Sequence, residues 1–154
     1  MFEVLMYLFE AVNYSDNELM VDRDDLTAEL SDAGFRNTEI LKALDWLDNL
    51  ATLQNTEFPT LSSPNSFRIY SKDEADWINA KCRGHILFLE QIKILDSQTR
   101  ELVIDCLMKI DQPELEIEDL QWVILMVLYN LPEAKESYQQ MEVLMYDTPN
   151  GYML

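Results

Sequence analysis

The sequence predicts a mostly α-helical protein, in which an N-terminal winged-helix-like unit of three helices and a small β hairpin is followed by a C-terminal helical bundle. Apolar residues recur three and four positions apart through most of the 154 residues, which is the spacing of a helix face. Only residues 67–70 alternate as a half-buried strand does. We therefore expect the winged-helix-like unit to span residues 1–70, the bundle 71–148 and a flexible tail 149–154.

Three helices are expected at the start of the chain. Residues 2–13 carry apolar side chains on one face and predict an amphipathic helix. Asp22 is suited to cap a second helix, and Gly34 closes it, because glycine takes the left-handed C-cap conformation without steric cost. Asn37 can cap a third helix over residues 37–50.

The wing is expected directly after the third helix. The helical spacing is lost over residues 51–66, where Pro59 and Pro64 indicate a loop. A strand at residues 67–70 needs a partner, and the nearest candidate is 51–55. The two segments together would form a β hairpin with a long tip.

The bundle is expected to begin at a capping box, in which Ser71 accepts from a backbone amide three residues on and Glu74 reaches back. The helix that starts there would break or bend around residues 83–84. Asp96 or Ser97 would cap the next helix.

A central helix is expected from the run at residues 122–129, which is apolar on every side and should pass through the middle of the bundle. Pro132 suits the first turn of the last helix. The same apolar run falls far short of the roughly 20 residues that span a bilayer. The N-terminus lacks the basic region of a signal peptide, so we expect a cytoplasmic protein that makes no membrane contact.

The charge balance is the strongest global feature. The chain has 11 Lys and Arg residues against 29 Asp and Glu residues, and its net charge is -18 at pH 7. Because proteins bind nucleic acids largely by neutralising phosphates, most of this surface would repel a polyanion. Residues 68–100 are the exception, since six basic residues stand there beside five acidic ones.

Five blocks of the sequence resemble the bacterial Smg family and together extend over essentially the whole chain: MFEVLMYLFE, the AGF turn with ALDWLDNL, FRIYS, CRGHILFLEQI, and DLQWVILMVLYN with the downstream YQQME. The resemblance carries no catalytic or binding residue over to this chain.

No catalytic or metal-binding constellation is evident. The single histidine, His85, follows Cys82 by three residues, and this pair could face one another on a helix. We favour a structural histidine at a helix junction, and we expect Cys82 and Cys106 to be reduced core thiols. Two thiols and one imidazole are too few ligands for a structural zinc. We predict neither an enzyme nor a cofactor.

The third helix decides the question of DNA binding. In a helix-turn-helix this element enters the major groove and presents donors and positive charge. Here it offers Lys42 against Glu39, Asp45 and Asp48. We therefore predict that it does not read DNA and instead docks a basic protein partner. The same acidic surface would also suit occupation of a nucleic-acid site on another protein.

An RNA- or ribosome-associated factor is the alternative hypothesis. Its contacts would be the basic and aromatic residues of the near-neutral segment. These residues are Arg68, Tyr70, Lys72, Lys81 and Arg83. Arg68 and Tyr70 would lie on one side of the strand, where they could also shield the edge of a hairpin.

A second possible partner surface is the end of the chain, where methionines and tyrosines are frequent. The residues are Met141, Met145, Tyr146, Tyr152 and Met153. For Met141 and Met145 we favour core packing.

Overall fold

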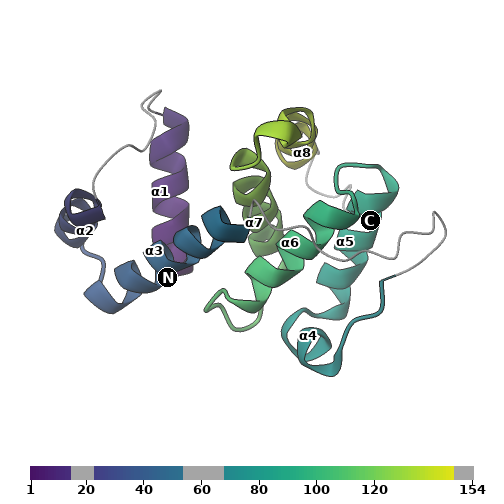
Figure 1. Cartoon of the computed structure of the whole chain (residues 1–154), viewed down its shortest axis with the longest axis horizontal. Coiled ribbons are helices and arrows are strands. Elements are labelled where there is room, and N and C mark those ends of the chain that lie inside the picture. The colour runs from purple at the N-terminus through teal and green to yellow at the C-terminus, as the bar shows by residue number, and fades with distance from the viewer. Residues whose placement is uncertain (15–22, 54–67, 148–154) are drawn as a thin grey trace.

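The computed structural model describes residues 1–14, 23–53 and 68–147, and every regular element in these ranges is helical (Figure 1). The helices are α1 (Phe2–Tyr14), α2 (Arg23–Asp32), α3 (Asn37–Leu53), α4 (Lys72–Trp77), α5 (Ala80–Gln91), α6 (Ser97–Met108), α7 (Ile117–Tyr129), the short 3-10 helix η1 (Pro132–Ala134) and α8 (Lys135–Asp147). The mostly helical class is therefore as predicted.

The turn between α2 and α3 confirms the predicted role of Gly34. Its φ is +101°, a backbone angle that side-chain-bearing residues rarely adopt. The Gly34 N–H donates to the Ser31 carbonyl at 3.0 Å, and the Phe35 N–H donates to the Leu30 carbonyl at 3.2 Å. These two bonds form a Schellman motif, which satisfies carbonyls at the end of α2. The predicted cap of α2, Asp22, lies outside the described residues.

The predicted wing is wrong. Residues 51–53 continue α3, and no strand occurs in the ranges given above. Thr52 Oγ1 donates to the Asp48 carbonyl at 3.0 Å, one helical turn back, which fits the continued helix. Residues 68–70 have no regular structure. The Arg68 side chain forms ion pairs with Glu74 of α4 and Glu101 of α6. These ion pairs, and not a neighbouring strand, position residues 68–70. The predicted tip, residues 56–66, lies outside the described residues, as do residues 54, 55 and 67 of the predicted strands.

The start of α4 confirms the capping box. The Glu74 N–H donates to Ser71 Oγ at 3.2 Å, and the Ser71 N–H donates to Glu74 Oε1 at 2.9 Å. The predicted break at residues 83–84 is misplaced, because α5 runs through both. The chain turns earlier, at the extended residue Ile78, and α5 restarts where the Asn79 side chain accepts from the Cys82 N–H at 2.9 Å.

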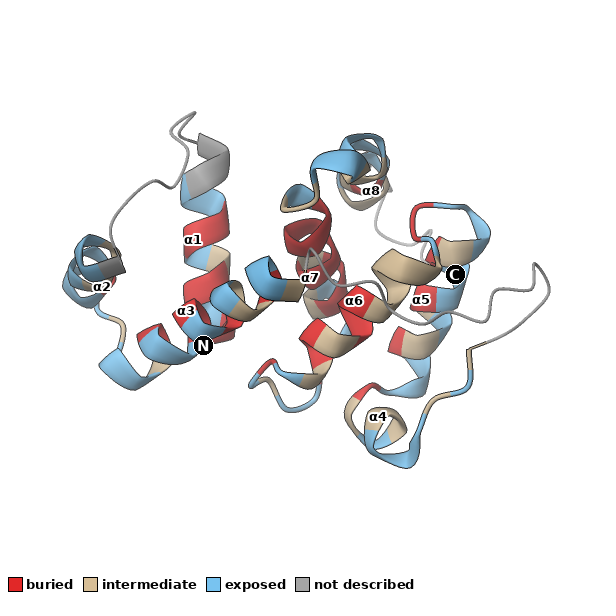
Figure 2. Ribbon diagram, viewed as in Figure 1, coloured by how far each residue is buried: buried red, intermediate tan, exposed pale blue. Residues whose placement is uncertain are grey.

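The core is one contiguous cluster with α7 at its centre (Figure 2). Residues 123–128 are all buried, as the apolar run predicts. Helix α6 begins at the predicted cap Asp96, whose side chain accepts from the Thr99 N–H at 2.8 Å. Both cysteines are free and buried, as predicted.

Aromatic side chains join α1 to the bundle. The Phe9 ring lies 6.2 Å from that of Trp122 and 5.7 Å from that of Tyr129, both edge to face. Edge-to-face pairs of this kind add to the energy of apolar burial. The first three helices therefore share their core with α7, and the orientation of α3 is set by the rest of the molecule.

Candidate functional site

Helix α3 buries one face and exposes the other. Its buried side chains are Ile40, Ala43, Leu44, Trp46 and Leu50. The opposite face includes Leu41, Lys42, Asp45 and Asp48, all exposed. The solvent-facing side of α3 therefore carries Asp45 and Asp48, in line with the acidic exposed face that the sequence predicts.

Trp46 fixes this orientation. The residue is only 3 % exposed, and its indole Nε1–H donates to the Cys106 carbonyl at 2.9 Å. The Cys106 carbonyl lies in the last turn of α6, where it also accepts from the N–H of the C-cap residue Lys109 at 3.3 Å. A buried indole that lacked such a partner would be costly. The bond therefore locks the angle of α3 against α6.

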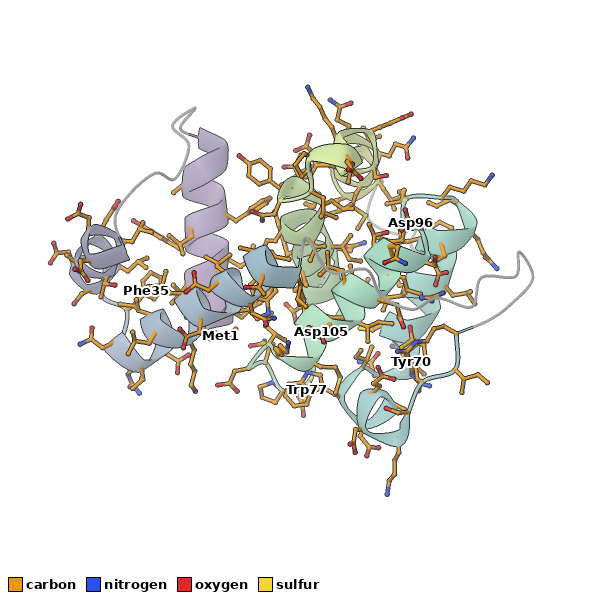
Figure 3. The ribbon with its side chains drawn as sticks, in the orientation of Figure 1. Met1, Phe35, Tyr70, Trp77, Asp96 and Asp105 are labelled. Carbon is orange, nitrogen blue, oxygen red and sulfur yellow. The ribbon has the colours of Figure 1, made fainter. Side chains whose placement is uncertain are left out.

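A cleft of about 420 Å³ lies between α3 and the loop that follows α6. We call it the α3 cleft, and its lining residues are Met1, Lys42, Asp45, Trp46, Asn49, Lys109 and Asp111. Met1 lies beside α3 in the side-chain view (Figure 3). Lysines and aspartates both contribute to the wall, so the cleft has mixed charge.

The lysines of the α3 cleft are held by neighbouring oxygens. Lys42 Nζ lies 2.7 Å from Asp111 Oδ2 and 3.8 Å from Glu39 Oε1. The Asp111 hydrogen bond raises the pKa of Lys42, and the same bond lowers the pKa of Asp111. Lys109 Nζ lies 2.9 Å from Asp105 Oδ2 and 3.2 Å from Asn49 Oδ1. A phosphate would compete with these contacts for either ammonium group.

Glu39 forms an ion pair at the start of α1. Its carboxylate pairs with the α-ammonium group of Met1, and this hydrogen bond lowers the pKa of Glu39. The carboxylate therefore helps to hold the start of α1 against α3. Of the four residues predicted on this helix, Lys42 and Asp45 line the cleft, Asp48 is exposed beyond it, and Glu39 is internally paired.

A second group of predicted residues surrounds Arg68. Its guanidinium binds Glu74 through both terminal nitrogens, at 2.5 and 2.9 Å, and it lies 3.2 Å from Glu101 Oε1. The hydrogen bond to Glu74 raises the pKa of Arg68 above its usual range and lowers that of Glu74 to about 2. Bidentate pairs with carboxylates are strong and directional. Arg68 is therefore a structural tie between α4 and α6.

Tyr70 lies close to two arginines. The centre of its ring is 5.0 Å from the Arg68 guanidinium carbon and 5.8 Å from that of Arg83. Burial raises the pKa of Tyr70 to about 12. The predicted proximity of Arg68 and Tyr70 is thus present, but cation–π packing produces it in the absence of a strand. Figure 3 shows Tyr70 beside α4.

The remaining candidate contacts differ in their surroundings. Arg83 Nε donates to the Ile78 carbonyl at 3.1 Å and so closes the turn between α4 and α5. Lys72 and Lys81 are exposed, at the starts of α4 and α5. The structure therefore brings Arg68, Tyr70 and Arg83 together and leaves the two lysines on the surface.

Cys82 and His85 have separate partners. The Cys82 thiol donates to the Leu115 carbonyl at 3.5 Å, and burial raises its pKa. His85 Nε2 lies 3.4 Å from Gln121 Nε2, and burial lowers the pKa of the imidazole. Neither shift favours a thiolate–imidazolium pair. Within the described ranges, no three or more His, Cys, Asp and Glu side chains are placed to hold a metal ion. No helix there is long and apolar enough to cross a membrane.

Sequence reasoning missed the far wall of the α3 cleft. Lys109 and Asp111 lie at and beyond the end of α6, more than 50 residues from α3 along the chain. No local pattern identifies them, because only tertiary packing brings this loop to α3. Asn49 was also missed, and its Nδ2 is buried without a hydrogen-bond partner among the described residues.

Comparison with known proteins gives a family. The sequence matches over residues 1–154 the family described as "Protein of unknown function (DUF494)". It is 54% identical over 153 residues to "Protein Smg homolog" of Shewanella baltica, with 98% of each chain covered. The protein of the same description from Shewanella oneidensis is 54% identical over 151 residues, which cover 97% of this chain and 96% of that one. No solved structure matches. The predicted resemblance is confirmed, and the chain belongs to the Smg family.

Proposed function

We propose that this protein is a non-catalytic docking protein that binds a basic segment of a partner protein on the exposed face of α3. The observation that carries the proposal is the outward position of Asp45 and Asp48 on α3, the second helix of the α2–turn–α3 pair, which is the place of the recognition helix in a helix-turn-helix. Carboxylates at that position repel phosphate and attract lysine and arginine side chains.

The surrounding charge supports a basic partner. Residues 1–53 contain 12 acidic and three basic residues. The one lysine of α3, Lys42, is already paired with Asp111 at 2.7 Å. A negative surface of this kind accelerates encounter with a positively charged partner and disfavours wrong ones.

The mixed-charge α3 cleft suits the same role. Its volume of about 420 Å³ lies within the range typical of small binding pockets. Asp45, in its wall, would meet an incoming ammonium or guanidinium group. The buried Trp46 hydrogen bond holds α3, and with it that wall, in place before the partner arrives, which reduces the entropy lost on binding.

The test is affinity capture from native extract with the full chain as bait, at about 50 mM salt, followed by elution with rising salt. An electrostatically recruited basic protein should elute before about 1 M, because screening lengths fall to a few ångströms there. A retained protein that is acidic, or one whose binding is insensitive to salt, would contradict the proposal. The proposed location is the cytoplasm, which suits two free, buried cysteines.

RNA or ribosome binding through the central segment is the second proposal. It rests on exposed Lys72 and Lys81, since Arg68 is held by two carboxylates. The variant Lys72→Glu/Lys81→Glu should lose co-sedimentation with ribosomes if this surface binds them. Unchanged co-sedimentation would remove this alternative.

A further inference from the structure

The exposed face of α5 is apolar and carries no acidic residue. Lys81, Gly84, Phe88 and Ile92 recur three and four positions apart along it, and all are exposed. Phe88 is 42% exposed and Ile92 43%, with Leu87 beside them at 36%. Single exposed apolar residues are ordinary on a protein surface, but neighbours in one stripe indicate a contact surface.

Nothing among the described residues requires a glycine at position 84. It lies inside α5, where glycine destabilises a helix relative to alanine. Its backbone does not need a left-handed angle, and a Cβ placed on it would meet nothing within 4 Å. The missing side chain therefore leaves a shallow place, in line with Phe88, where a second backbone can approach closely.

The exposed charged residues at the two ends of this stripe are lysines. The one acidic residue of α5, Glu90, is intermediate in exposure, and its carboxylate lies 3.0 Å from Arg100 Nη1. Lysines stand at both ends of the stripe, at positions 81 and 93. Lys93 follows the C-cap Ile92 and has a left-handed φ of 65°, where glycine would be the unstrained choice. A protein with a net charge of -18 thus keeps one helix face apolar and flanked by cations.

We propose that the exposed face of α5 docks an amphipathic helix of a partner protein that carries carboxylates beside its apolar stripe. The surface and the sign of the charge both differ from those of α3, so the inference goes beyond the proposed function and stands independently of it. Phe88, Ile92 and Leu87 would pack against the apolar stripe of the partner. The lysines at the two ends, Lys81 in the first turn of α5 and Lys93 just beyond its C-cap, would meet its carboxylates.

Close approach at Gly84 explains why a helix fits this face well. Small residues let two helix backbones come nearer than larger side chains allow, and ridges of one helix then enter the grooves of the other. A Cβ at position 84 would push the partner helix outward, although the isolated protein has room for it.

The experiment is amide chemical-shift mapping on the full chain with two synthetic 18-residue helical probes. Both have leucine along one face, and the other positions are glutamate in the first probe and lysine in the second. The glutamate probe should bind at micromolar concentration and shift the amides of residues 80–93. The lysine probe should leave those amides unchanged.

Three variants locate the contact. Phe88→Ala/Ile92→Ala should lower the affinity for the glutamate probe at least tenfold. Gly84→Ala should lower the affinity for the glutamate probe severalfold while raising the thermal midpoint of unfolding. A loss of affinity in a more stable protein cannot result from unfolding. Val143→Ala, at a residue 56% exposed on α8, is the control and should bind as the wild type does.

The outcomes that overturn the proposal are distinct. Equal binding of both probes to residues 80–93 would show an apolar patch without charge selectivity. Concentration-dependent dimerisation that Phe88→Ala abolishes would show that a second copy of the chain covers the face. The variant Asp45→Lys/Asp48→Lys changes the α3 surface and should leave binding of the glutamate probe unchanged. The α5 and α3 proposals can therefore fail separately, and each failure can be recognised.

Discussion

Trp46 and Trp77 donate their indole N–H groups to consecutive carbonyls at the end of α6. Trp46 Nε1 lies 2.9 Å from the Cys106 carbonyl oxygen, and Trp77 Nε1 lies 2.7 Å from that of Leu107. The two tryptophans belong to α3 and α4, and Figure 3 labels Trp77 at α4. The last turn of α6 is therefore a common anchor that sets the orientation of both helices.

Trp46→Phe should destabilise the protein by about 1–3 kcal/mol, because the buried Cys106 carbonyl loses its side-chain donor and the smaller ring leaves space. Urea unfolding followed by far-ultraviolet circular dichroism measures the change. Trp77→Phe removes the equivalent bond at a half-buried site and should cost less. Equal stability of Trp46→Phe and wild type would show that this bond does not anchor α3.

Gly34→Ala and Gly84→Ala should change the free energy of unfolding in opposite directions. At Gly34 the φ of +101° strains any residue with a Cβ, so the substitution should cost at least about 1 kcal/mol. At Gly84 the Cβ meets nothing within 4 Å, and alanine should stabilise α5 by about 0.5–1 kcal/mol. Thermal unfolding of both variants gives the comparison. A stabilising Gly34→Ala would mean that the Schellman turn is not needed.

Acid should remove the contribution of Glu74. Arg68 lowers the pKa of Glu74 to about 2, whereas an unfolded glutamate titrates near about 4.3. The folded state therefore binds fewer protons at this group, and the stability it contributes is fully present above about pH 4.3 and is lost as the pH falls towards about 2. The measurement is the unfolding free energy of wild type and Glu74→Gln from about pH 7 to about pH 2.5.

The difference between the two proteins should shrink as the pH falls through that window. Arg68→Met provides the control, because Glu74→Gln in that background should show a much weaker dependence on pH. A wild-type advantage that stays constant down to about pH 2.5 would show that the Arg68–Glu74 pair is not formed in solution.

Duplex DNA should not bind. The exposed carboxylates of α3 repel phosphate, and Lys42 is engaged by Asp111. Fluorescence anisotropy with a labelled duplex of random sequence at about 50 mM salt checks this. A micromolar complex that weakens as salt rises would contradict the prediction.

Local signals in the sequence predicted most of the helices. The caps at Ser71, Asp96 and Gly34 depend on hydrogen bonds within a few residues, and each is present as expected. The hydrophobic run of α7 predicted its central place, because a helix that is apolar on every side has to be buried.

Competing interactions explain the errors. The segment 51–53 was expected to leave the helix, but it continues α3. Arg68 was expected in a strand, but its side chain forms ion pairs with carboxylates of α4 and α6. Glycine at position 84 was expected to break a helix, but an exposed helical glycine costs only about 1 kcal/mol, which packing of Cys82, Ile86 and Leu89 offsets. The pairing of Lys42 with Asp111 depends on residues far apart in sequence, so no pattern predicted it.

The most direct test of the central claim compares two charge-matched variants as baits for the partner captured at about 50 mM salt. Asp45→Lys/Asp48→Lys changes α3, and Glu133→Lys/Glu136→Lys makes the same change of charge at exposed positions in η1 and α8. If α3 is the docking surface, the first variant should capture at least tenfold less partner than the wild type, and the second should capture nearly as much as the wild type. Equal loss by both variants, or no loss by the first, would contradict the account.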